Sequence, residues 1–149
     1  MPNTYKCRST EEIVEVCREF LAKHPNCKAI VTKGWNEINF DADKQRLPDR
    51  HDMDKVSTEI PIVLSRVCGH CAVVNTLALE RAGFGKNHTV DGGKVELEED
   101  GTPNGRIYEN AISEVMNFVP PFSPQELAEC MEEGMKYAVA HGLTTVQCN

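Results

Sequence analysis

The sequence predicts an α+β fold with about four helices and five or six short strands. Helix-capping signals precede apolar residues at helical spacing, and short β-branched runs are bounded by Gly or Pro. The chain has 149 residues, 40% of them apolar, which suits one domain that buries about two-thirds of its unfolded surface. We therefore expect a single α+β domain over residues 1–149.

Two capping boxes predict the longer helices. In the first, the Ser9 hydroxyl can accept the amide of Glu12, whose carboxylate can reach back, and His24-Pro25 stops the helix. The second box, at residues 123–126, starts a long helix that Gly142 ends. The residues expected to form the buried stripe of this long helix are Leu127, Cys130, Met131, Met135, Ala138 and Val139.

Shorter elements lie between these helices. We expect helices from Asn75 to Gly83 and over Ala111–Phe118. The expected strands are residues 29–31, 61–65, 93–98, 105–108 and 144–148. Residues 36–54 show no periodicity and predict a long loop with one helical turn, and long loops of this kind are often functional.

Composition excludes several classes of protein. The net charge of -7 and the lack of a basic patch argue against nucleic acid as a partner. No apolar stretch approaches the roughly 18 residues of a membrane span, and no secretory signal opens the chain. The seven cysteines are scattered and odd in number, which favours a reducing, cytoplasmic location.

The motif Cys68-Gly69-His70-Cys71 carries the strongest local signal. A histidine inside C-x-x-C can stabilise a thiolate, so a thiol–disulfide oxidoreductase is an alternative function. Such motifs sit between a buried strand and a helix N-terminus, and the strand at 61–65 and the helix at Asn75 loosely provide that context. No βαβ units precede the motif, and two incidental apolar cysteines are the competing interpretation. A zinc site would need a second ligand pair, for which only His24 and Cys27 are available.

The remaining polar clusters indicate ordinary structural roles. His51-Asp52-Met53-Asp54 is typical of turn and cap chemistry, and His88 and His141 fit structural positions. No His-x-His, His-Glu-x-x-His, phosphate loop or Gly-x-Ser-x-Gly motif occurs. The residues by themselves do not form a complete catalytic site.

The order of signals from Trp35 to Val146 resembles the large metal-dependent amidohydrolases, the type that includes N-substituted formamide deformylase. The matching residues are Gly34-Trp35-Asn36, residues 47–57, residues 61–66, Gly69-His70, residues 75–79, Ala82-Gly83, Gly92-Gly93, residues 100–105, Glu109, Ala111 and residues 142–146. In this pattern Gly69-His70 belongs to the hydrolase signature, and Cys68 and Cys71 merely flank it.

The resemblance implies that this chain is an internal segment inserted in a metal-dependent (β/α)₈-barrel hydrolase. The parent enzyme would cleave a C–N bond in a small amide-type substrate with a divalent metal, zinc being the expected ion, and a homo-oligomer is compatible with it. The family's metal ligands lie outside these motifs, so no metal is expected in this chain alone. The segment would form a wall or lid of the substrate pocket and would be inactive by itself.

Four residues are the candidates for substrate contact that the resemblance implies. Arg66 and His70 would end a strand and face the pocket, and Asn75 would pin the turn that follows. Imidazole can donate to a developing oxyanion, and Trp35 offers an apolar wall with one donor. A structural role for His70 and a plain core position for Trp35 remain the competing interpretations. Cys148 could approach the metal, although an inert thiol is the simpler alternative.

Overall fold

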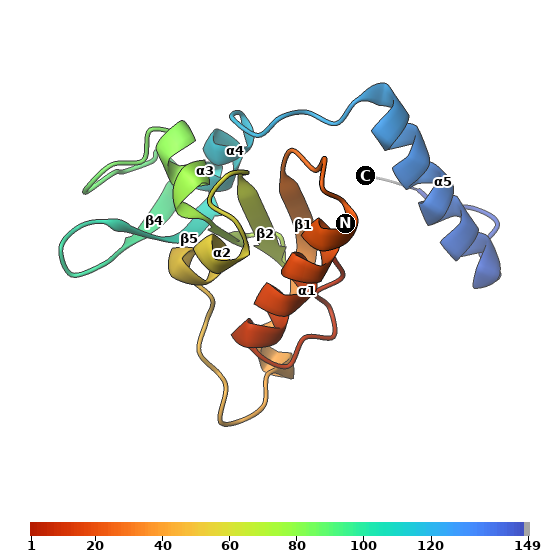
Figure 1. Ribbon diagram of the computed structural model, residues 1–149, viewed down its shortest axis with the longest axis horizontal. Coiled ribbons are helices and arrows are strands. Elements are labelled where there is room, and N and C mark those ends of the chain that lie inside the picture. The colour runs from red at the N-terminus through yellow and green to blue at the C-terminus, as the bar shows by residue number, and fades with distance from the viewer. Residues whose placement is uncertain (148–149) are drawn as a thin grey trace. The chain divides into compact units, whose positions relative to one another are not determined.

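A five-stranded mixed sheet organises residues 1–119 in the computed structural model, which describes residues 1–147 (Figure 1). The strands are β1 (Ile30–Trp35), β2 (Ile62–Arg66), β3 (Cys71–Val74), β4 (Gly93–Leu97) and β5 (Pro103–Glu109), in the order β1-β2-β3-β5-β4. β1 and β2 are parallel, and the other neighbours are antiparallel. The mixed α+β class predicted from the sequence is confirmed.

Helices precede, interrupt and follow these strands. They are α1 (Thr10–Lys23), the 3₁₀ helix η1 (Glu37–Asn39), α2 (Arg50–Val56), α3 (Thr76–Arg81), α4 (Asn110–Met116) and α5 (Pro124–Ala140). Across residues 1–147, no helix combines the length and apolar character that crossing a membrane requires. The chain forms two compact units, residues 1–119 and the residues from Pro120 onward.

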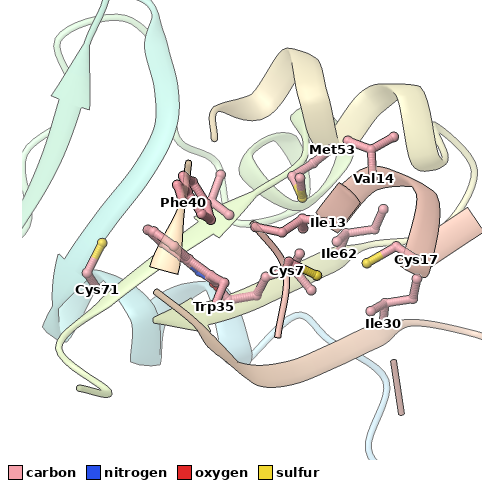
Figure 2. Close-up of a cluster of buried hydrophobic side chains, with 12 residues drawn as sticks. Cys7, Ile13, Val14, Cys17, Ile30, Trp35, Phe40, Met53, Ile62 and Cys71 are labelled. Atoms are coloured by element: carbon pink, nitrogen blue, oxygen red, sulfur yellow. The ribbon is translucent and has the colours of Figure 1, made fainter. Parts of the chain in front are cut away.

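The sheet buries apolar side chains on both faces, because alternate residues of a strand point to opposite sides. On β2, Ile62 and Leu64 join one cluster while Val63 joins the other. Helices α1 and α2 contribute to the first cluster, and α3 and α4 contribute to the second. Figure 2 shows the first cluster, in which Trp35 packs with residues of α1, α2, β1 and β2.

The two capping boxes predicted from the sequence differ in whether both of their hydrogen bonds form. Ser9 Oγ accepts the Glu12 amide at 3.1 Å, but the Glu12 carboxylate accepts the amide of Arg8 at 2.8 Å instead of returning to Ser9. The first box is therefore only half formed. The second is complete: Ser123 Oγ accepts the Glu126 amide at 3.2 Å, and the Glu126 carboxylate accepts the Ser123 amide at 2.7 Å.

Two elements were not predicted from the sequence. Helix α2 lies at the end of the expected loop and begins at a capping box made by Asp49 and Asp52, which differs from the usual Ser/Thr and Glu/Gln pattern. Strand β3 occupies Cys71–Val74, between the first residues of the C-x-x-C motif and the helix expected from Asn75, where no strand was predicted. Its four residues are all buried, so they show no alternation of apolar and polar residues.

Two predictions for the C-terminal unit were wrong. Helix α5 forms as expected, but none of its residues is buried, and Met131 and Val139 are 67% and 71% exposed. Residues 144–147 form no strand, and the expected strand's last residue, Cys148, lies outside the described residues. Helical spacing determines which side chains share a face, whereas burial requires a partner for that face. A strand likewise needs a neighbour for its backbone hydrogen bonds.

Candidate functional site

A pocket of about 300 Å³ lies where β2 ends and the β2–β3 turn meets the end of β5. The residues that line it are Trp35, Glu37, Leu47, Arg66, Cys68, His70, Cys71, Tyr108 and Glu109. The structure thus brings Trp35, Arg66 and His70 to one place, although 35 positions separate the first from the last. Asn75 does not line the pocket.

Arg66, the last residue of β2, makes a two-pronged ion pair with Glu37 of η1. Its Nε and Nη2 donate to the two carboxylate oxygens at 2.8 and 2.7 Å, and Nη2 lies 3.5 Å from Asn36 Oδ1. The hydrogen bond from Arg66 lowers the pKa of Glu37. Because Arg66 and Glu37 both line the pocket and the Arg66 side chain remains 23% exposed, the pair places a guanidinium and its compensating carboxylate side by side at the pocket wall. Glu37 was not predicted as a site residue, because it lies within the loop expected over residues 36–54.

His70 lies on the β2–β3 turn beside Glu109. The two are also linked through the backbone, since the Glu109 amide donates to the His70 carbonyl at 3.3 Å. His70 Nδ1 is 3.1 Å from Glu109 Oε2, and the two side chains are 72% and 56% exposed. The hydrogen bond to Glu109 raises the pKa of His70. An ionised Glu109 can only accept, so the neutral imidazole carries its proton on Nδ1 and leaves Nε2 available as an acceptor.

The aromatic residues of the pocket have their polar atoms engaged within the fold. Trp35 is 1% exposed, and its Nε1 donates to the Leu64 carbonyl at 2.8 Å. The Tyr108 hydroxyl donates to Glu96, and burial raises the pKa of this tyrosine. Trp35 therefore occupies a core position, and its single donor is used by the fold and not offered to the pocket.

Asn75 is fully buried and holds the connection between β3 and α3. Its Oδ1 accepts the amides of Ile62 at 3.0 Å and Ala78 at 3.1 Å, and its Nδ2 donates to the carbonyls of Ser57 and Ile60, both at 2.9 Å. Every donor and acceptor of this amide has a partner. The structure gives Asn75 the turn-pinning role, and it leaves no free group for a substrate.

The Cys68–Cys71 motif occupies an antiparallel turn between β2 and β3, not the N-terminus of a helix. Cys68 is exposed, and the hydrogen bond with Arg66 lowers its pKa. Cys71 is buried, and burial raises its pKa to about 11. The two thiols are free. The strand–helix context that the oxidoreductase alternative required is absent here, and nothing supports that alternative.

The described residues do not provide a metal site. Among residues 1–147, no three His, Cys, Asp or Glu side chains come together in a way that could hold an ion. In the cluster that begins at His51, the Asp52 carboxylate binds Arg46 and Lys55, while Asp54 accepts from the amide and hydroxyl of Thr76. These carboxylates serve structural roles.

The family model of the amidohydrolase family matches residues 2–149 of this chain. The chain therefore belongs to the amidohydrolase family. It is similar to the protein named as amidohydrolase YtcJ in Bacillus subtilis (strain 168), with 30% identity over 91% of this chain and 26% of the relative. It is also similar to the protein LONG AFTER FAR-RED 3 of Arabidopsis thaliana, with 32% identity over 78% of this chain and 20% of that protein.

Two solved structures share its fold. An uncharacterized metal-dependent hydrolase from Pyrococcus furiosus matches 98% of this chain and 27% of its own, with a TM-score of 0.61 and 20% identity. A second, from Pyrococcus horikoshii OT3, gives the same TM-score with 18% identity and 26% of its own chain covered. The chain spans about a quarter of the length of these relatives.

Proposed function

We propose that residues 1–149 are an internal segment of a larger metal-dependent amidohydrolase that hydrolyses a C–N bond in a small amide-type compound. The observation that carries this proposal is the family match over residues 2–149, in a chain that spans about a quarter of its relatives. The parent enzyme would be a (β/α)₈ barrel close to the N-substituted formamide deformylase type.

The C-terminal unit supports the idea of a segment within a longer chain. Helix α5 has a continuous apolar stripe that includes Leu127, Met131 and Met135, which are 49%, 67% and 59% exposed. Contiguous exposed apolar surface of this kind is uncommon on independent domains. In this proposal the rest of the barrel would cover the apolar stripe of this helix.

In this proposal the segment orients the substrate. Arg66, ion-paired with Glu37, and His70, a titratable donor, lie in one pocket with Tyr108 and the buried Trp35. Such a pocket suits an uncharged polar group, such as an amide carbonyl, that carries an apolar substituent. The described residues do not fit a metal ion, so we propose that residues outside this chain hold it, with zinc as the expected metal.

A cytoplasmic location is part of the proposal. Six cysteines among the described residues are free, and half of them are buried. A reducing compartment preserves such thiols. A homo-oligomeric parent enzyme is compatible with this location.

Hydrolysis assays on the longer polypeptide test the function. We expect metal-dependent release of amine from a panel of N-substituted amides, and His70→Ala should lower kcat roughly 10- to 100-fold with little change in stability. Asp43→Ala, in an exposed loop position, is the control and should leave kcat unchanged. Absence of amide hydrolysis, or a stoichiometric metal ion in the purified 149-residue chain, would contradict the proposal. An unchanged rate in His70→Ala with lower stability would assign His70 a structural role.

A further inference from the structure

Glu109 adopts a backbone conformation that suits glycine. It connects β5 to α4 with φ 52° and ψ −124°, and only one other non-glycine residue in the described chain, Asn87, has a positive φ. This combination matches the first central position of a type II′ turn, where a side chain clashes with the backbone and glycine is preferred. A glutamate at this position therefore costs stability.

The surrounding structure holds this conformation in place. The Glu109 amide donates to the His70 carbonyl at 3.3 Å, and Glu109 pairs with Gly93 in the β4–β5 ladder. On the other side, Asn110 Nδ2 donates to the Asp91 carbonyl at 2.9 Å. Strained residues persist where neighbours fix them from several sides, and they concentrate at functional sites.

The side chain of Glu109 does not cap the helix that it precedes. Glu109 is the N-cap residue of α4, yet it makes no side-chain capping bond. Its carboxylate instead reaches His70 Nδ1 at 3.1 Å. An exposed ion pair contributes little stability, less than a strained backbone of this kind costs. The fold therefore does not need this carboxylate for its stability, which points to another use.

We propose that Glu109 is the positioning residue for His70, fixing the imidazole as the Nδ1–H tautomer with Nε2 directed to the substrate. The identity of the substrate carbonyl rests on the proposed function, whereas the geometry of the Glu109–His70 pair does not. In the neutral state His70 Nε2 accepts a proton, and in the protonated state it donates one. A ring held in one orientation can therefore act as a general base or as a general acid. Cys71 and Tyr108 are paired in the antiparallel β3–β5 ladder, so His70, just before Cys71, and Glu109, just after Tyr108, lie next to that pair.

Other charges act on the same imidazole. Cys68 raises the pKa of His70 in the same direction as Glu109, and Lys33 opposes both. Lys33 lies against the β2–β3 turn, where its Nζ would be 3.2 Å from a Cβ added to Gly69. A test of the pair must therefore change Glu109 while leaving Lys33 and Cys68 in place.

Imidazole NMR on the 149-residue chain separates positioning from folding. In the wild type we expect the Nδ1–H tautomer at high pH and a raised titration midpoint for His70. Glu109→Gln should lower that midpoint and mix the tautomers. Glu109→Gly should do the same and also raise the thermal midpoint by about 3 °C or more, because the strain disappears. Asn87→Gly relieves the other positive φ and should leave His70 unchanged.

Two NMR results would overturn the proposal. One is an Nε2–H tautomer in the wild type, and the other is a His70 titration that neither Glu109 variant moves. In the longer enzyme, Glu109→Gln should lower kcat roughly tenfold or more with KM unchanged and shift the pH profile in the direction of the NMR midpoint. If the longer enzyme hydrolyses no amide while the NMR results hold, the proposed function fails and the positioning role stands. If kcat and the pH profile are unaffected, the positioning role fails.

Discussion

Asp52 offers a quantitative test of how this fold is held together. Its carboxylate is 3% exposed and accepts from Arg46 Nη1 at 2.6 Å, from Lys55 Nζ at 3.0 Å and from the Asp49 amide at 3.1 Å. Burial raises the pKa of Asp52, but these hydrogen bonds outweigh it and lower the pKa from 3.8 to about 2. We predict that Asp52→Asn destabilises the chain in a pH-dependent manner.

The size of the destabilisation by Asp52→Asn follows from the lowering of the Asp52 pKa. A lowering from 3.8 to about 2 corresponds to about 2 kcal/mol of stability at neutral pH. Because the folded-state pKa is the lower one, this contribution is complete above pH 5 and is lost as the pH falls toward 2. Between pH 7 and pH 3 the difference between wild type and Asp52→Asn should shrink by about 1 kcal/mol.

Urea unfolding measures this difference. The chain has one tryptophan, Trp35, which is 1% exposed, so its fluorescence reports unfolding of the sheet unit. Asp43→Asn, in an exposed loop position, is the matched control and should change stability by less than about 0.5 kcal/mol. A destabilisation by Asp52→Asn that is equal at pH 7 and pH 3 would refute the reasoning, because the charge would then contribute nothing.

Three further predictions address the site and its support. Asn75→Ala should cost about 2–4 kcal/mol because it removes four hydrogen bonds to the backbone, two of them buried and two partly buried. A loss below 1 kcal/mol in urea unfolding would contradict this. Trp35→Phe should cost about 1–3 kcal/mol, measured by circular dichroism, because the Leu64 carbonyl loses its donor; unchanged stability would argue against it. A thiol reagent should modify Cys68 before the exposed Cys130, because Arg66 lowers the pKa of Cys68. Mass spectrometry measures the order of modification, and the reverse order would refute that role of Arg66.

Local signals in the sequence were sufficient wherever a single segment decides its own conformation. Ser9 and Ser123 begin helices because a hydroxyl can accept a nearby backbone amide, and this interaction needs no distant partner. Strand β2 was predicted because its β-branched residues favour an extended, buried backbone. Helix α2 was missed because aspartates form its capping box, a less familiar version of the same chemistry.

Tertiary structure decided which site residues pair with each other and which apolar faces are covered, because contacts between distant segments leave no local signal in the sequence. The sequence determined the mixed α+β class and, through the order of its motifs, membership of the amidohydrolase family. It also nominated Arg66 and His70. Only the folded chain could pair these residues with Glu37 and Glu109, which lie 29 and 39 positions away. The same reason explains α5: its periodicity fixed an apolar face, but what covers a face depends on a partner that periodicity does not specify.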